Sequence, residues 1–442
     1  MRMFLGWLLA ALAVASLARA AEPAHYDVKA SFGRDAALKA NVEITLPPEE
    51  VGTETSFLIG ERFTLRKASA PGATVSTEPT DRPIGGLRKI TFRFAQAPTK
   101  PVKLKFAYDG PLNNPDTDNS GTPWLGHDLL ELRLETMWIP VRTDISLQYV
   151  VDADLKGVPA DFTLVFPGEV RRSGDRVRLH RALPDVDTPM VALRHAATAK
   201  GPGVVFAGPD DDPLVETYRG HATAAAAWLQ QWLGPLPFGD VRIVVVPRKG
   251  GSSYARRNYT VISRPSEDDP DKTGNPNYGR LIGHEFAHAW WSVAGPQTED
   301  YWLVESLAEY SAGRYVEHFA GPEGYRKVID AKVDRAKGSG PVMPGKRPTR
   351  EALYQRGPLL LIDLEHRIGR AKMDDMLRAL AKDPPRRTGQ LLAELERVAG
   401  PAEAQRFAAA LRADAMPAVQ LYAGEPAKAV AAASSIDSES KR

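Results

Sequence analysis

The chain has 442 residues, enough for two or three domains with sizeable cores. Its 57 Lys and Arg residues nearly balance its 55 Asp and Glu residues, so the net charge of +2 gives no sign of a nucleic-acid partner. There is no cysteine, which excludes a disulfide framework, a zinc site with Cys ligands and a thiol nucleophile.

The first twenty residues predict a signal peptide, and we therefore expect a periplasmic or secreted protein. Arg2 supplies the positive start, an apolar run follows over 4–17, and Ala18-Arg19-Ala20 has the small residues of a cleavage site. The apolar run is too short to span a bilayer comfortably. An uncleaved N-terminal anchor is the alternative, and no later segment is apolar enough for an integral membrane helix.

Residues 21–198 predict a β-rich N-terminal domain, either a sandwich or a saddle. Short segments with alternating polar and apolar residues recur there, and turn clusters such as Pro71-Gly72 separate them. The stretch 196–203, AATAKGPG, predicts a linker to the next domain.

The segment 205–321 predicts a mixed domain with helices and strands. Asp212-Pro213 is typical of a helix start, and this helix is expected to run to about Leu233. Continuous apolar residues predict strands over 241–246 and 259–263, before two further helices.

Those two helices hold the residues with the most specific chemistry. His284, Glu285 and His288 have H-E-x-x-H spacing, and residues four apart on a helix share a face, so both imidazoles can bind one metal ion. Glu285 points beside that pair, where it can hold a water that the metal activates. Glu305 on the second helix would be a third ligand and leave the fourth position open, as in a catalytic zinc site. A plain core helix is disfavoured because burying unpaired ionisable groups costs several kcal/mol.

These motifs together resemble the M1 family of gluzincin metallopeptidases, which includes aminopeptidase N and leukotriene A4 hydrolase. The chain has HEFAH at 284–288 and WLVES at 302–306, where the family typically has W-L-N-E-G. It has YQRG at 354–357, which is similar to the family's Y-x-K-G. The resemblance implies an α+β multidomain protein: a β-rich N-terminal domain, a thermolysin-like zinc catalytic domain over 205–321, and a short helical C-terminal part.

The resemblance also implies roles for single residues. In the family, the residues that match His284, His288 and Glu305 hold one zinc ion per chain. The match to Glu285 is the general base for a zinc-bound water, and the match to Tyr354 stabilises the transition state. We therefore expect an exported zinc metallopeptidase that acts on peptides or proteins. The alternative is a module of the same fold that binds peptides in a zinc-dependent way without hydrolysing them.

The substrate side departs from the family pattern. The stretch 249–258 stands where M1 aminopeptidases have G-x-M-E-N, and it lacks the Glu that holds the free amine of the substrate. Gly250 and Gly251 are expected to form an edge along which a peptide can pair. Arg256 stands near the place of the missing Glu, where its free cation is expected to disfavour a substrate amine and favour an acidic group. Whether the enzyme is an aminopeptidase or an endopeptidase therefore stays open.

Three further residues are candidates for supporting roles. Arg356 is a candidate for binding a substrate carbonyl or carboxylate. Glu309 lies one helical turn beyond Glu305, and either hydrogen-bonds a ligating histidine or lies on a solvated helix face. Asp300 is a second candidate for the same support.

The last part of the chain predicts helices and a tail. Residues 322–416 predict a helical C-terminal part that includes Tyr354, with helices near 323–337, 357–368, 372–381, 390–398 and 402–412. Residues 417–442 are rich in Ala, Ser and charged residues and predict a disordered tail.

Overall fold

The structure is a computed structural model. It describes residues 22–33, 35–80, 86–113, 124–125, 128–210, 212–249, 253–264 and 277–427. The predicted signal peptide and residues 428–442 of the predicted tail lie outside the described residues. In the part of the chain that is described, none of the helices has the length and apolar character needed to cross a membrane.

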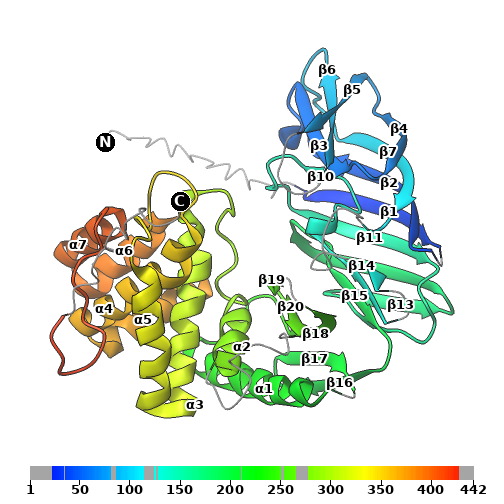
Figure 1. Ribbon diagram of the computed structural model, residues 1–442. Helices are drawn as coiled ribbons and strands as arrows, with labels where there is room; N and C mark the ends of the chain where they lie inside the picture. The colour runs from blue at the N-terminus through cyan, green and yellow to red at the C-terminus, as the bar shows by residue number, and fades with distance from the viewer. Residues whose placement is uncertain are drawn as a thin grey trace, which may run out of the picture.

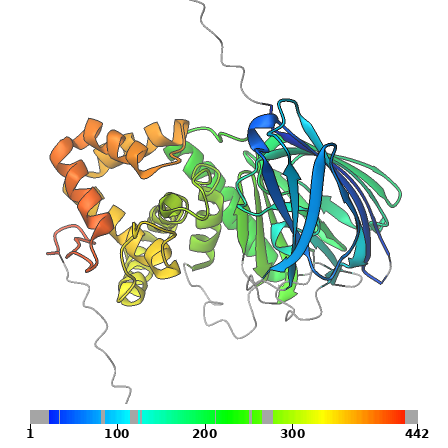
Figure 2. The same cartoon turned by 90° about the horizontal axis from the view of Figure 1, so that it is seen from above.

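Figure 1 shows the sheets of the first half on one side of the molecule and the helices of the second half on the other. The view from above in Figure 2 shows the same separation. A smaller sheet with two helices joins the halves. One of these helices carries His284 and Glu285 of the H-E-x-x-H motif.

The largest sheet of the N-terminal part has seven strands in the order β13-β14-β11-β1-β2-β7-β4. Its central strands alternate buried and accessible residues, as the sequence pattern predicts, so one face packs on the core. β1 pairs with β11 in parallel, whereas its other neighbour β2 is antiparallel. The bounds are β1 (Ala24–Phe32), β2 (Ala37–Leu46), β4 (Thr64–Ser69), β7 (Val102–Pro111), β11 (Tyr149–Lys156), β13 (Glu169–Ser173) and β14 (Arg176–Asp185).

Two four-stranded sheets complete the N-terminal part, in the orders β10-β3-β6-β5 and β12-β15-β9-β8. The second of these sheets lies next to the second half of the chain, because the backbone carbonyl of its residue Val165 accepts a hydrogen bond from the hydroxyl of Tyr259. The bounds are β3 (Glu54–Gly60), β5 (Ala73–Thr80), β6 (Leu87–Phe94), β8 (Trp124–Leu125), β9 (Leu129–Leu132), β10 (Val141–Arg142), β12 (Thr163–Val165) and β15 (Met190–Leu193), with 3-10 turns η1 (Pro48–Glu50) and η3 (Leu134–Thr136).

The five-stranded sheet of the second half begins inside the predicted linker. β16 (Ala196–Gly201) pairs antiparallel with β17 (Val204–Pro209), so the prediction of a linker over 196–203 is wrong. The signal was weak because β16 is an edge strand with no fully buried residue and carries only small or polar side chains. The sheet order is β16-β17-β18-β20-β19, with β18 (Val241–Lys249), β19 (Tyr254–Arg256) and β20 (Tyr259–Arg264).

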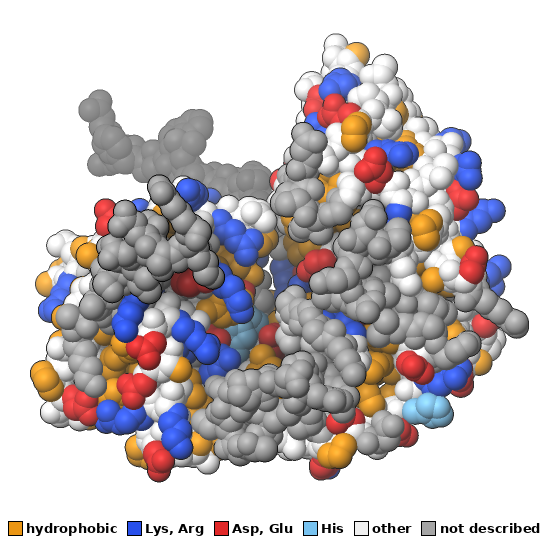
Figure 3. Space-filling model, in the orientation of Figure 1, with side chains coloured by type: hydrophobic (Ala, Val, Ile, Leu, Met, Phe, Trp, Pro, Cys, Tyr) orange, Lys and Arg blue, Asp and Glu red, His pale blue; other side chains and the backbone are white. Residues whose placement is uncertain are grey.

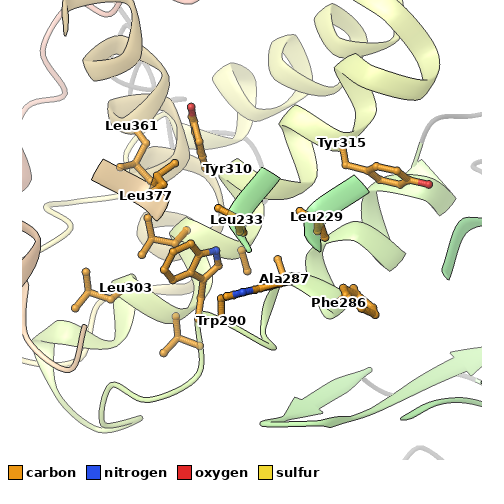
Figure 4. Packing of buried hydrophobic residues seen from close by; sticks show 14 of the residues in the cluster. Leu229, Leu233, Phe286, Ala287, Trp290, Leu303, Tyr310, Tyr315, Leu361 and Leu377 are labelled. Atoms are coloured by element: carbon orange, nitrogen blue, oxygen red, sulfur yellow. The ribbon is translucent and has the colours of Figure 1, made fainter. Parts of the chain in front are cut away.

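Helix α1 (Pro213–Leu233) packs on this sheet, α2 (Asn277–Ala287) packs on α1, and α3 (Trp302–Ala336) packs on α2. They share one large buried cluster with the C-terminal helices. Figure 4 shows Trp290, from the turns after α2, among leucines from α1, α3 and later helices. This core fixes α2 against α3, the two helices that carry the predicted metal ligands.

Helix α3 is a helical hairpin. Gly321 has a backbone φ of 67° and Pro322 follows it, so the helix breaks there and starts again. Lys332 contacts Glu309 although 23 residues separate them, and along a straight helix that separation would be about 34 Å. The second half of α3 therefore runs back along the first.

The remaining helices follow the sequence prediction closely. They are the π-helical turn η5 (Ala352–Arg356), α4 (Gly357–Ile368), α5 (Arg370–Lys382), α6 (Thr388–Ala399) and α7 (Pro401–Arg412), with the 3-10 turn η4 (Glu299–Tyr301) before α3.

The start of the predicted disordered tail is ordered. Val419 and Leu421 are buried in the core of the helical part, and the hydroxyl of Tyr422 donates to Asp330 at 2.8 Å. The prediction of disorder is therefore wrong for residues 417–427, because three apolar side chains find a place between helices that the local composition does not reveal.

Candidate active site

The three predicted metal ligands converge. Nε2 of His284 lies 3.1 Å from Nε2 of His288, and Oε2 of Glu305 lies 3.4 Å and 3.7 Å from these two nitrogens. Zinc–ligand bonds of about 2.0–2.1 Å in a tetrahedron place two ligand atoms about 3.3–3.4 Å apart. Among the described residues, this is the one group of His and acidic side chains whose atoms come close enough to share a metal ion.

The surroundings of these atoms also fit a cation. All three side chains are buried, and Oε2 of Glu305 accepts no hydrogen bond from the described residues. A buried carboxylate oxygen without a partner is costly, and a metal ion removes that cost. The donor set of two imidazoles and one carboxylate is the set of a catalytic zinc site that keeps an open position.

The end of α2 orients His288. The helix ends at Ala287, and the chain tightens into turns in which Ala289 and Trp290 donate to the carbonyls of Phe286 and Ala287. Nδ1 of His288 lies 3.0 Å from the backbone carbonyl of Trp291. This contact places the proton on Nδ1 and leaves Nε2 free to bind a metal.

A buried carboxylate orients His284. The structure places Oε1 of Glu309 at 3.2 Å from Nδ1 of His284, the nitrogen that faces away from the centre. Glu309 is in turn held by Arg280 at 2.7 Å and Lys332 at 2.5 Å. Burial alone would raise the pKa of Glu309, but these two cations hold it well below its usual range. Glu309 therefore stays charged and keeps the His284 ring in place.

Tyr301 supports the third ligand, and the sequence analysis missed it. Its hydroxyl donates to Oε1 of Glu305 at 2.7 Å, which leaves Oε2 for the metal. The two residues are four apart at the start of α3, so the signal was a tyrosine one helical turn before the ligand.

Glu285 lies beside the ligands as a free carboxylate. It is 6% exposed, and its Oε2 has no hydrogen-bond partner among the described residues. Burial raises its pKa to about 7, against the opposite effect of His284, and a cation bound at the centre would lower this pKa. A carboxylate with a pKa between its usual value and 7 suits a general base near neutral pH.

Tyr354 faces the same centre from the C-terminal part. Its ring stacks against the His284 ring, with the ring centroids 5.6 Å apart. Burial and the negative charge of Glu305 raise the pKa of Tyr354, so the phenol keeps its proton and can donate it in a hydrogen bond. Tyr354 lies in the π-helical turn η5, and its backbone carbonyl accepts a hydrogen bond from Lys332 at 2.9 Å. Such turns often occur at functional sites.

Two supporting candidates do not reach the centre. Arg356 is 1% exposed, and its guanidinium donates to backbone carbonyls of the segments around residues 340 and 413–415. Arg356 therefore holds the segment 413–415 in place and does not reach the site to bind substrate. Asp300 accepts hydrogen bonds from the backbone and side chain of Thr388, both at 2.8 Å, and so caps the start of α6. Both predictions fail because the partners are far away in the sequence.

The predicted substrate loop also needs correction. Gly250 and Gly251 lie outside the described residues. Arg256 is bound by Asp187 at 2.7 Å and by Glu135 at 3.0 Å. Its charge is therefore compensated, and the prediction that it offers a free cation to the substrate is wrong. The sequence could not show this because both carboxylates come from the N-terminal part.

Comparison with known proteins adds to this geometry. No protein-family model and no curated protein matches the chain. Among solved structures, the chain is similar to an M1 zinc metallopeptidase from Deinococcus radiodurans, with a TM-score of 0.65 and 18% identity over 92% of this chain and 96% of that one. This chain has the M1 metallopeptidase fold.

Two further structures agree. A mutant of the Deinococcus enzyme bound to a Tyr-Ser-Ala substrate matches with a TM-score of 0.64 at 18% identity, over 91% of this chain and 96% of that one. Leukotriene A4 hydrolase from Saccharomyces cerevisiae matches with a TM-score of 0.62 at 16% identity, over 90% of this chain and 68% of that one. The predicted fold, an α+β multidomain protein of M1 type with a helical C-terminal part, is confirmed.

Proposed function

We propose that this protein is a zinc-dependent metallopeptidase that hydrolyses peptide bonds in peptides or proteins. The observation that carries the proposal is the convergence of His284, His288 and Glu305 at distances suited to one zinc ion, next to the free carboxylate of Glu285. The M1 fold supports the same activity, since the similar structures are zinc metallopeptidases.

The chain's own residues divide the reaction between them. When bound, the zinc ion supplies Lewis-acid activation of the scissile carbonyl and of the attacking water. Glu285 takes the proton of that water as general base and returns it to the leaving amine. The hydroxyl of Tyr354 donates a hydrogen bond to the oxyanion that develops on the carbonyl, a contact worth about 3–4 kcal/mol in the transition state.

Buried polar contacts keep the ligands in place during this reaction. Glu309 holds His284, the carbonyl of Trp291 holds His288, and Tyr301 holds Glu305. Each ligand therefore has a partner for the atom that faces away from the centre, which is the arrangement expected of a stable metal site.

We propose in addition that the protein is exported to the periplasm or secreted. This rests on the positive start, the apolar run and the small residues at 18 and 20. N-terminal sequencing of the protein from cell fractions tests it, since a start near residue 21 in the exported fraction is expected.

The decisive experiment separates the base from the ligand. The wild type should contain one zinc per chain by elemental analysis and should cleave peptides in a mixture followed by mass spectrometry. Glu285→Gln should keep its zinc and lose hydrolysis by orders of magnitude, whereas Glu305→Gln should bind zinc more weakly. Glu317→Gln, a partly exposed acid further along α3, is the matched control and should keep both properties.

Two outcomes would redirect the proposal. Loss of zinc from Glu285→Gln with retention in Glu305→Gln would reverse the two roles. Peptide binding with zinc but without any turnover would favour the alternative, a zinc-dependent binding module. Comparing free and N-acetylated forms of each cleaved peptide then separates an aminopeptidase from an endopeptidase.

A further inference from the structure

A cationic rim, defined as Lys346, Arg347 and Arg350, lies on the loop between α3 and η5. All three side chains are exposed, and the three residues lie within five consecutive positions, 346–350. Among the described residues, no carboxylate lies within ion-pair distance of any of them. Most other arginines of the helical part have such a partner, so this rim carries uncompensated positive charge.

The loop that carries the rim is anchored. The backbone N–H of Gly345 donates to Glu299 at 3.1 Å, and the hydroxyl of Thr349 donates to the carbonyl of Ser339 at 2.8 Å. Pro348, between the two arginines, is buried. The three cations are therefore presented from a fixed backbone, which lowers the entropy cost of binding an anion there.

Two of the cations pack against tyrosines that themselves contact the predicted metal ligands. The Arg347 guanidinium lies 4.8 Å from the ring centroid of Tyr301, whose hydroxyl donates to Glu305. The Arg350 guanidinium lies 5.1 Å from the ring centroid of Tyr354, which stacks against His284. Cation–π attraction favours both positions.

The surface view agrees with this placement. In Figure 3, Lys and Arg side chains gather on the helical side of a hollow between the two halves, and a histidine side chain is visible in that hollow.

The charge of Arg256, by contrast, is compensated. Three arginines meet three acids there in one network of ion pairs: Arg133, Arg248 and Arg256 with Glu131, Glu135 and Asp187.

We propose that the substrates of this site are peptides with a carboxylate beside the scissile bond, and that Arg347 and Arg350 bind this carboxylate. The group is either an acidic side chain or the C-terminal carboxylate of a short peptide, since both offer two oxygens to a guanidinium fork. The inference rests on the proposed peptidase function and names its substrate class.

The test uses peptides in matched pairs. One series exchanges Glu for Gln at each position around the scissile bond, and a second exchanges a free C-terminus for an amide. Hydrogen bonds between charged groups predict a kcat/KM ratio of roughly 10- to 100-fold in favour of the acidic member. The series in which the ratio appears shows whether the carboxylate comes from a side chain or from the C-terminus.

Variants of the rim test whether Arg347 and Arg350 cause the preference for acidic peptides. Exchanging both Arg347 and Arg350 for Gln should bring the ratio close to one. Arg406→Gln, a well-exposed arginine on α7, is the matched control and should leave the ratio unchanged. Raising the salt concentration should reduce the wild-type ratio, because exposed charges are screened over about 10 Å at 0.1 M.

A binding measurement keeps this test independent of turnover. Glu285→Gln, which lacks the general base, is titrated with fluorescent acid and amide peptides, and tighter binding of the acid is expected to disappear when Arg347 and Arg350 are also exchanged. Equal affinities for acid and amide, or equal kcat/KM values in the wild type, overturn the inference. If the wild type cleaves neutral and acidic peptides equally, the proposed function stands and the inference about the cationic rim fails. If no peptide is cleaved, the proposed function fails, and the titration still decides whether the rim binds carboxylates.

Discussion

Glu309→Gln is expected to weaken zinc binding although every ligand remains. Glu309 is 3% exposed and holds Nδ1 of His284 through a carboxylate that Arg280 and Lys332 keep charged. Exchange of such a partner typically lowers metal affinity by about 10- to 100-fold, equivalent to about 1.4–2.7 kcal/mol. The upper end is expected here, because the neutral amide leaves two cations uncompensated beside the ligand.

Competition with a chromophoric chelator measures this loss directly, at a pH near 7. The same variant should also unfold more easily without zinc, because the ammonium of Lys332 stays buried without its countercharge, at a cost of about 3–5 kcal/mol. Affinity is therefore compared only at temperatures where the zinc-free variant is folded by circular dichroism. Glu317→Gln on the same helix is the control. A zinc affinity of Glu309→Gln equal to that of the wild type would refute the reasoning and reduce Glu309 to a structural ion pair.

The other predictions concern three side chains near the same centre. Tyr354→Phe removes one donor, so kcat should fall about 100- to 1000-fold with little change in KM, and an unchanged kcat would assign the residue to packing. Tyr301→Phe should lower zinc affinity about 10-fold in the chelator assay, since Glu305 loses its orienting bond; equal affinity would argue against that role. Arg256→Gln should destabilise the protein by about 3–5 kcal/mol in urea unfolding, and a change in substrate preference without loss of stability would contradict its pairing with Asp187 and Glu135.

The sequence was informative where function depends on local spacing. His284 and His288 are one helical turn apart, and Glu305 lies in the first turn of the next helix, so both motifs are visible within short segments. The helices after residue 322 were also predictable, because their apolar residues recur with the helical period and Gly or Pro marks their ends.

The sequence was misleading where side chains have partners far along the chain. Arg256 is separated from Asp187 by 69 residues, and Asp300 from Thr388 by 88. No periodicity connects such pairs, so a charged residue near a motif is assigned to the site although its partner lies elsewhere. Residues recognised by their spacing in a motif were therefore assigned correctly to the centre. Residues chosen only because they are charged and near a motif were not.

The hairpin in α3 links the proposed metal ligands to Tyr354, the proposed oxyanion donor. The first half of the helix carries Glu305 and Glu309, and the break at Gly321 returns the second half so that Lys332 reaches the same place. From there its ammonium contacts both Glu309 and the backbone carbonyl of Tyr354. One buried cation thus supports a ligand through Glu309 and fixes the turn that carries the tyrosine. Because Lys332 donates to both groups, a shift of one half of the hairpin would move the metal ligand and the oxyanion donor together.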